Sequence, residues 1–286
     1  MTDERRLVIV SGKGGVGKSA VAASTALTAH RRGARVLALA MSGDGGGLAA
    51  HLGVPPLEFE PREDRPGLST SVVNRSKALV EYLQVQVGLP PIMAFGPAVR
   101  AFDALASAAP AVREIVTMGK VLWEVKREVW DLVVVDAPPT GQIGSYLRAA
   151  RSITELVLSG RIREQAAWME HILAEPGATN LTLVTLAEEL PTSETVEALT
   201  WLRKEEVVGE TTVMTNRLLP PLDHASANLP SGRAGDAARL HLSLYTEQQR
   251  WLDRLPPDIR LPYLFGTMTP TEVSALLADT LEEVLP

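Results

Sequence analysis

The segment Gly12-Lys13-Gly14-Gly15-Val16-Gly17-Lys18-Ser19 constrains the fold of this chain more than any other part of its sequence. It fits the pattern G-x-x-x-x-G-K-(S/T) at every required position. It follows Leu7-Val8-Ile9-Val10, an apolar run that predicts a buried strand, and it leads into an alanine-rich stretch from Lys18 to about Arg32 that predicts a helix. A strand, a glycine-rich turn and a helix in this order predict a phosphate-binding loop, or P-loop, in an α/β domain.

The residue types in this loop suit a nucleoside triphosphate bound with Mg²⁺. Glycines let backbone N–H groups approach the phosphates, and the helix N-terminus favours negative charge. Lys18 is predicted to contact the β- and γ-phosphates, and Ser19 to bind Mg²⁺. The alternative is a glycine-rich turn that binds nothing. The predicted nucleotide-binding residues here are Gly12, Lys13, Gly14, Gly15, Val16, Gly17, Lys18, Ser19 and Ala20.

Further short apolar runs predict the rest of a parallel sheet. The second strand, Val36–Ala40, completes a strand–helix–strand unit within the first 40 residues, which favours a parallel sheet with right-handed crossovers. Three later runs also predict strands: Leu132–Val135, Leu181–Thr185 and Thr211–Met214. We therefore expect one doubly wound α/β domain over residues 1–286, with a mostly parallel sheet.

Two segments interrupt this pattern. Residues 76–128 are helical in pattern and unusually apolar, which predicts a helical insertion within the domain. Residues 220–236 are rich in Pro, Ser, Asn, Gly and Asp and predict a long surface loop. The insertion has more apolar residues than one helix face buries, and they pack on the domain or against a second subunit unless they hold a partner: Leu79, Val80, Tyr82, Leu83, Val85, Val87, Leu89, Ile92, Met93, Phe95, Val99 and Phe102.

Composition excludes several classes of function. The chain has no cysteine, so disulfides, thiolate metal sites (zinc sites among them) and cysteine nucleophiles are excluded, and its five histidines share no metal-ligand spacing. The net charge of −6 argues against a nucleic-acid partner. No apolar run matches a secretory signal or reaches the roughly 18 residues of a membrane span. We expect a cytoplasmic protein that does not insert into membranes.

Lys13, directly after the first glycine, makes this loop a deviant Walker A motif. The sequence resembles the dimeric SIMIBI class of P-loop ATPases, which includes ArsA, the tail-anchored-protein targeting ATPase, ParA and MinD. The resemblance implies that the chain binds ATP and Mg²⁺ and forms a homodimer, or a heterodimer with a paralogous ATPase. It also implies that Lys13 reaches across the dimer interface to the partner's nucleotide. The alternative is a solvated loop lysine.

Other segments resemble the ArsA and targeting-ATPase branch. Residues 131–147 are similar to the Asp-Thr-Ala-Pro-Thr-Gly-His segment of that branch. The resemblance implies that Asp136 faces the Mg²⁺ site and that residues 138–142 form the second switch. Asn216 and the adjacent Arg217 match the adenine-side segment, and Pro262 lies in a run similar to the loop that packs on the adenine. Asn216 is expected to hydrogen-bond the base, and a turn asparagine is the alternative.

The sequence also departs from this branch. The first switch usually has Asp-Pro after the second strand, but here Asp44 stands in Met41-Ser42-Gly43-Asp44-Gly45. Asp44 either orients the attacking water or is a loop residue with no catalytic role. Gln142 replaces the usual His. The cysteine pair that holds zinc at the targeting ATPase's dimer interface is absent, as are the arsenite-binding cysteines, so we expect neither zinc nor arsenite.

In the targeting ATPase, helices inserted at this place form a hydrophobic groove for a client segment, so the resemblance implies such a groove in the insertion; ordinary packing is the alternative. These features favour a Mg²⁺-dependent ATPase whose nucleotide cycle opens and closes a dimer and drives binding of a client or partner. The predicted catalytic residues are Lys13, Lys18 and Asp44, and the predicted metal ligands are Ser19 and Asp136. The alternative is an ATP-binding regulatory subunit with little hydrolysis, paired with an active paralogue. A ParA-like DNA-partitioning protein is disfavoured by 34 acidic against 28 basic residues. A MinD-like membrane ATPase is disfavoured because the last helix contains no Lys or Arg.

Overall fold

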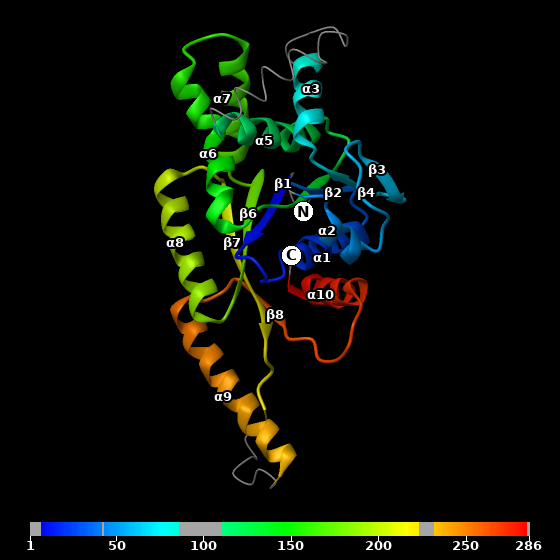
Figure 1. Cartoon of the computed structure of the whole chain (residues 1–286), viewed down its shortest axis with the longest axis vertical. Coiled ribbons are helices and arrows are strands. Elements are labelled where there is room, and N and C mark those ends of the chain that lie inside the picture. Colours follow the sequence, from blue (N-terminus) through cyan, green and yellow to red (C-terminus); the bar gives the residue numbers. More distant parts are fainter. Residues whose placement is uncertain (1–6, 42, 86–109, 223–231, 285–286) are drawn as a thin grey trace.

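The computed structural model describes residues 7–41, 43–85, 110–222 and 232–284. Within these residues an eight-stranded sheet runs through the centre of the molecule in the order β3-β4-β2-β5-β1-β6-β7-β8 (Figure 1). All neighbouring strands are parallel except β3 and β4. The strands are β1 (Leu7–Gly12), β2 (Val36–Ala40), β3 (Arg62–Arg65), β4 (Leu68–Val72), β5 (Leu132–Asp136), β6 (Thr179–Leu186), β7 (Glu210–Leu218) and β8 (Ile259–Pro262).

Helices cover both faces of this sheet (Figure 1). One face packs against α1 (Lys18–Arg31), α2 (Gly46–Leu52) and α10 (Pro270–Val284). The other packs against α5 (Pro110–Lys126), α6 (Thr140–Leu156), α7 (Arg161–Ala174) and α8 (Glu189–Glu205). Helix α3 (Arg75–Val85) lies beside α5.

Strand β1 explains why the sheet is buried on both faces. Leu7 and Ile9 point into the core formed with α5 to α8, whereas Val8 and Val10 point into the core formed with α1 and α10. Side chains alternate between the faces of a strand, so a run of four apolar residues buries both faces. The predicted doubly wound, mostly parallel α/β fold is confirmed.

The edge of the sheet differs from the prediction. The apolar runs in the sequence predict no strand at residues 61–66, but Arg62–Arg65 forms β3, which pairs antiparallel with β4. The run Arg-Glu-Asp-Arg has no apolar residue to indicate a strand, because β3 lies at the edge of the sheet. Its side chains are partly or fully exposed except that of Asp64, which is buried in an ion pair with Arg62. The sequence pattern also missed α6 and α7.

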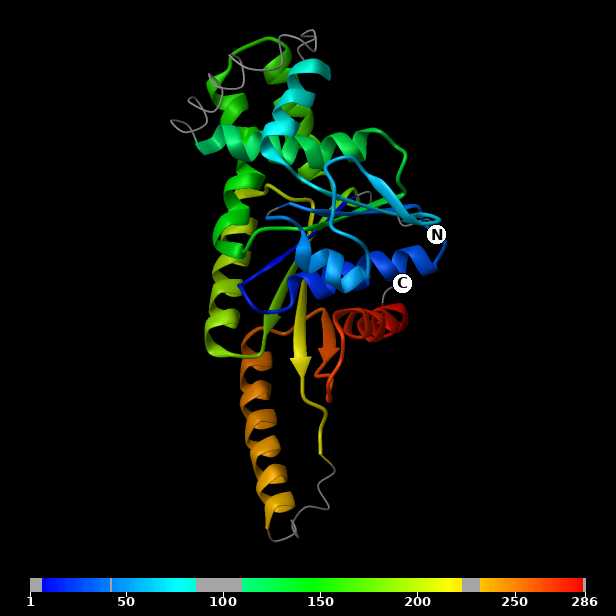
Figure 2. The ribbon, with the colours of Figure 1, turned by 45° about the vertical axis from the view of Figure 1, so that its right-hand side comes forward.

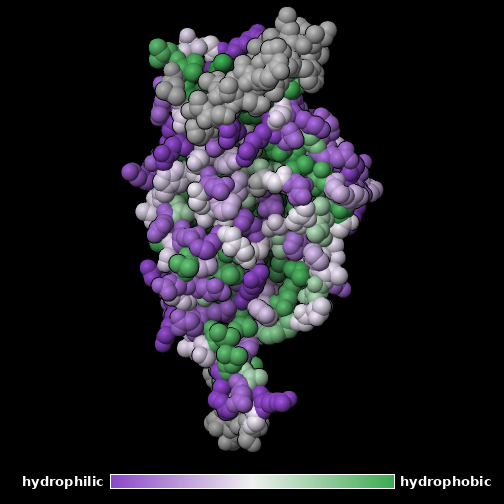
Figure 3. Space-filling model, in the orientation of Figure 1, coloured by the Kyte–Doolittle hydropathy of each residue, from purple (hydrophilic) through white to green (hydrophobic). Residues whose placement is uncertain are grey.

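Helix α9 (Arg233–Arg254) begins inside the segment that was predicted to be a loop. In Figures 1 and 2 it projects away from the sheet as a narrow arm, beside the chain that continues from β7. Leu240 and Leu244, one turn apart on α9, have exposed fractions of 61% and 50%. Figure 3 shows a mostly hydrophilic face, with hydrophobic side chains gathered where this arm leaves the body.

The predicted insertion is described only at its two ends, α3 and α5. Residues 86–109 lie outside the described residues, and so do Ile92, Phe95 and the side chain of Leu83. The groove or packing role of these apolar residues therefore stays a prediction.

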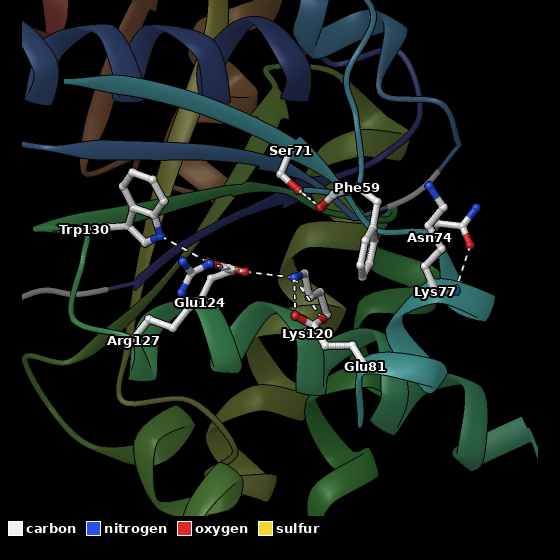
Figure 4. Close-up of polar contacts among 9 residues, drawn as sticks. All are labelled: Phe59, Ser71, Asn74, Lys77, Glu81, Lys120, Glu124, Arg127 and Trp130. Atoms are coloured by element: carbon white, nitrogen blue, oxygen red, sulfur yellow. Dashed lines mark hydrogen bonds and ion pairs between the residues drawn. The ribbon is translucent and has the colours of Figure 1, made fainter. Parts of the chain in front are cut away.

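A buried lysine joins the two ends of the insertion (Figure 4). The ammonium group of Lys120, on α5, lies 2.9 Å from the carboxylate of Glu124 and 2.9 Å from that of Glu81 on α3. It also lies 4.4 Å from the ring centre of Phe59, in the segment before β3. The indole N–H of Trp130 donates to Glu124 at 3.2 Å. One cation thus ties α3, α5 and the sheet edge together.

Candidate functional site

The P-loop turns tightly between β1 and α1, and two of its glycines are required by the space around them. A Cβ on Gly12 would lie 2.1 Å from the carbonyl oxygen of Val184, on the neighbouring strand β6. A Cβ on Gly17 would lie 2.5 Å from Nδ2 of Asn216. Gly17 also has φ of +97°, which side-chain-bearing residues rarely adopt. The glycine spacing of the motif is therefore fixed by packing against β6 and β7.

Lys18 is positioned over this loop. It is the first residue of α1, and its ammonium group donates to the carbonyl oxygen of Lys13 at 3.2 Å. Burial lowers the pKa of Lys18, while the nearby carboxylate of Asp136 opposes that shift. A partly desolvated cation held across a loop of backbone N–H groups is suited to bind phosphate oxygens.

Ser19 and Asp136, the predicted metal ligands, lie together. Strands β1 and β5 are adjacent, so the end of β5 comes next to the start of α1. The hydroxyl of Ser19 donates to Oδ2 of Asp136 at 2.6 Å. Burial raises the pKa of Asp136, and the Ser19 hydrogen bond and the charge of Lys18 oppose this shift. A buried carboxylate beside a hydroxyl is a pair of hard oxygen donors, which fits Mg²⁺.

The predicted second switch begins directly after Asp136. The buried Ser11 hydroxyl, on β1, donates to the carbonyl oxygen of Pro138 at 2.7 Å. Helix α6 starts at Thr140, and Gln142 lies exposed in its first turn. This segment therefore connects the P-loop strand to α6 through a short, hydrogen-bonded turn.

Asp44 lies in the loop between β2 and α2. Its Oδ1 accepts a hydrogen bond from the N–H of Gly46 at 2.9 Å, so the carboxylate caps the chain entering α2. The first turn of α2, which follows this loop, approaches the metal-site residues, because a Cβ on Gly47 would lie 3.0 Å from the hydroxyl oxygen of Ser19. Asp44 is exposed. Its position next to this turn fits either role, orienting the attacking water or serving only in the loop. The catalytic role of Asp44 therefore stays a prediction.

Asn216 lies at the P-loop, but its amide is engaged with backbone. Its Nδ2 donates to the carbonyl oxygen of Val16 at 2.9 Å, and its Oδ1 accepts from the N–H of Arg217. Arg217 has φ of +57° and an exposed side chain. Pro262 ends β8 and pairs with Leu218. The base contact predicted for Asn216 stays a prediction, while its contact with the P-loop is a finding that the sequence did not indicate.

The sequence also gave no signal for Glu194. This residue lies on α8, and its carboxylate forms an ion pair with the ammonium group of Lys13. The two are 181 positions apart, and nothing in the local sequence of α8 distinguishes Glu194 from its acidic neighbours.

Glu194 also lines a cavity of 670 Å³ between α6 and α8. Thr140 and Gly141, from the predicted second switch, form part of the opposite wall. Trp201, on α8, packs close to Gly144 on α6, where an added Cβ would lie 3.3 Å from the indole. The start of α6 and Glu194, the partner of Lys13, thus line the same cavity.

Comparison with known proteins shows what this site belongs to. The profile of the anion-transporting ATPase family, ArsA_ATPase, matches residues 5–158, which include the P-loop, Asp44 and Asp136. ATPase BagA of Mycobacterium tuberculosis (strain ATCC 25618 / H37Rv) is 34% identical over 241 residues, which cover 78% of this chain and 69% of BagA. The chain belongs to the ArsA-like ATPase family. It is an ATP hydrolase.

A second relative of this ArsA-like chain agrees. The Mycobacterium bovis protein Mb3704, whose name also contains the word ATPase, is 34% identical over 241 residues, with the same coverage of 78% and 69%. Among the described residues, no helix is long and apolar enough to cross a membrane. The same residues contain no group of three or more His, Cys, Asp or Glu side chains arranged to hold a metal ion.

Proposed function

We propose that this ArsA-like ATPase uses Mg²⁺-bound ATP and that two subunits associate around their nucleotides. The observation that carries the proposal is the Ser19–Asp136 pair, 2.6 Å apart at the start of the P-loop helix. Ser19 would bind the metal directly, and Asp136 would hold it directly or through water. Mg²⁺ would supply neutralisation of phosphate charge.

The chain's own residues supply the rest of the site. The P-loop amides and Lys18 hold the phosphates and stabilise the negative charge that is transferred during hydrolysis. Burial of Lys18 and Asp136 strengthens these interactions because the local dielectric is lower than in water. Asp44 is our candidate for orienting the attacking water, since it lies directly before the turn of α2 that approaches Ser19.

Lys13 supports the proposal that two subunits associate. Its side chain is 30% exposed and pairs with Glu194 on α8, whereas the ammonium of Lys18 lies over the loop. A lysine at the rim of the loop can reach a second subunit's phosphates once it leaves Glu194. Association would then bring a second cation, Lys13 of the other subunit, to each nucleotide. The structural change on association would pass through the start of α6 to the insertion and to any hydrophobic client that the insertion holds.

Steady-state hydrolysis by the purified chain tests this function. We expect Mg²⁺-dependent turnover, and we expect Lys18→Ala to abolish or greatly weaken ATP binding in calorimetry. Lys13→Ala should retain ATP affinity but lose ATP-dependent association and most turnover. Near-normal affinity of Lys18→Ala would refute the P-loop assignment, and a monomeric, fully active Lys13→Ala would refute the role of Lys13.

The assay also separates the two kinds of function considered. A chain that hydrolyses ATP alone acts as a homo-oligomeric ATPase. A chain that binds ATP tightly but turns it over only when mixed with a paralogous ATPase acts as the regulatory member of a heterodimer. Mass measurement by light scattering, with and without ATP, distinguishes these outcomes.

A further inference from the structure

The contact between Lys13 and Glu194 joins the P-loop to the second turn of α8 within one subunit. The side chain of Lys13 is 30% exposed and that of Glu194 is 40% exposed. Lysine is a point charge on a flexible stem with four rotatable bonds. The carboxylate of Glu194 therefore decides where this charge lies, because the backbone of the loop does not.

The direction of this contact matters for the proposed function, on which this inference rests. Glu194 draws Lys13 towards α8 of its own subunit. A lysine held there is not free to bind phosphates of a second subunit, since one ammonium group cannot contact the Glu194 carboxylate and those phosphates at the same time. We propose that Glu194 is a positioning residue that holds Lys13 within its own subunit, and that ATP-dependent association must break this ion pair.

The exposure of the pair makes this release feasible. Partly exposed ion pairs are weak, because water solvates both charges and salt screens them. The triphosphate of a second subunit carries several negative charges and competes well for one ammonium group. Glu194 thus lowers the fraction of subunits that are ready to associate without blocking association.

Charged residues on the cavity wall determine how much free energy it costs to separate Lys13 from Glu194. When Lys13 leaves, the carboxylate of Glu194 loses its counter-charge on a wall that also carries Glu197, three residues along the same helix. Like charges at this helical spacing repel. Glu114 lines the same cavity, and its Oε2 is buried without a hydrogen-bond partner. Arg148 also lines this cavity, but it pairs with Glu205. The carboxylates therefore favour the contact with Lys13 and so raise the ATP concentration needed for association.

Glu194→Gln tests the proposal, because it removes the charge and keeps the shape. We expect half-maximal association to occur at a concentration of ATP roughly three- to tenfold lower, since the associating state no longer competes with the internal ion pair. Glu197→Gln is the matched control: it removes the same charge from the same helix and cavity wall but leaves the ion pair with Lys13 in place. Because it relieves only the repulsion on Glu194, we expect a clearly smaller shift than for Glu194→Gln. Unchanged association of Glu194→Gln would overturn the proposal.

A double mutant separates Lys13 from other effects of Glu194. In a Lys13→Ala background, which we expect not to associate, Glu194→Gln should not restore ATP-dependent association, because Glu194 acts only through Lys13. Association restored by Glu194→Gln in that background would overturn the proposal, since Glu194 would then act through α8 or the cavity.

Chemical labelling tests the contact without relying on association. Acetylation of Lys13 in the nucleotide-free chain, measured by mass spectrometry against the exposed Lys77, should rise in Glu194→Gln and rise clearly less in Glu197→Gln. Equal labelling of Lys13 in wild type and Glu194→Gln would overturn the internal contact. A wild type that does not associate with ATP would refute the proposed function, while the labelling would still decide where Lys13 lies.

Discussion

Asn216, at the end of β7, donates a hydrogen bond of 2.9 Å from Nδ2 to the carbonyl oxygen of Val16 inside the P-loop. The two residues are 200 positions apart, and the Asn216 side chain closes against Gly17, where there is no room for a Cβ. The residue is 5% exposed. The amide therefore supports the loop that holds the phosphates, whether or not it also contacts the base.

This geometry predicts how Asn216→Ala changes nucleotide affinity. Loss of a buried hydrogen bond costs about 1 to 2 kcal/mol, so we expect roughly tenfold weaker binding. Because the effect passes through the P-loop, ATP and GTP should weaken by the same factor. Calorimetry with both nucleotides checks this. Asn180→Ala removes a comparable buried amide on β6, bonded to Thr212, and should leave affinity unchanged. A loss confined to ATP would instead show a base contact.

Asp44→Asn tests the candidate for orienting water. We expect ATP to bind normally and turnover to fall by about 10²-fold or more, the usual scale for loss of a positioned base. Asparagine keeps the Oδ1 that accepts from Gly46, so the loop into α2 should retain its shape. Single-turnover hydrolysis is the measurement. Unchanged turnover would move the catalytic role to another residue.

Lys120→Met should destabilise the chain strongly. Removing the cation leaves the partly buried Glu81 without its partner and the fully buried Glu124 with only the ion pair to Arg127, at 3.0 Å. Breaking a buried pair costs up to about 3 to 5 kcal/mol. Lys77→Met is the control: Lys77 is exposed and lies 5.9 Å from the ring centre of Phe59, so little should change. Denaturant titration compares the two. Equal stability of both variants would mean that the Lys120 cluster does not hold the ends of the insertion.

His51 gives a prediction for acid pH. Its Nδ1 lies 2.9 Å from the carbonyl oxygen of Pro270 and 2.8 Å from the hydroxyl of Ser274, linking α2 to α10. Burial lowers the pKa of His51 below its ordinary value of 6.5, although the contact with Pro270 and the charge of Asp136 oppose this.

The sign follows from proton binding by the two states. Below pH 6.5 the unfolded chain takes up a proton at His51 while the folded chain resists it. The stability contributed by neutral His51 is thus complete above that pH and declines as the pH falls towards the folded-state pKa. Urea unfolding at about pH 7.5 and about pH 5.5 should show a smaller acid loss for His51→Gln than for wild type. Equal losses would show that other groups cause the acid sensitivity.

Much of the fold was predictable because its signals are local. The P-loop is eight consecutive residues between a strand and a helix, and the apolar runs of β1, β2 and β5 carry their own burial signal. Strand β3 was missed because it is an edge strand of charged residues, held to β4 by backbone hydrogen bonds and not by apolar side chains. Such a strand leaves no apolar pattern. The position of Asp136 at the site could be predicted only through resemblance to known ATPases.

The sequence by itself determined that this chain builds a phosphate-binding loop on a parallel α/β sheet, since residue order and apolar periodicity fix both. Only the tertiary structure decided which distant groups meet at that loop. Lys13 contacts Glu194 and Val16 contacts Asn216 because β6 lies next to β1 in the sheet and β7 lies next to β6. The order of strands brings together residues that are 181 and 200 positions apart. Local sequence does not encode such contacts, because they depend on side chains of two elements whose packing is set by the whole core.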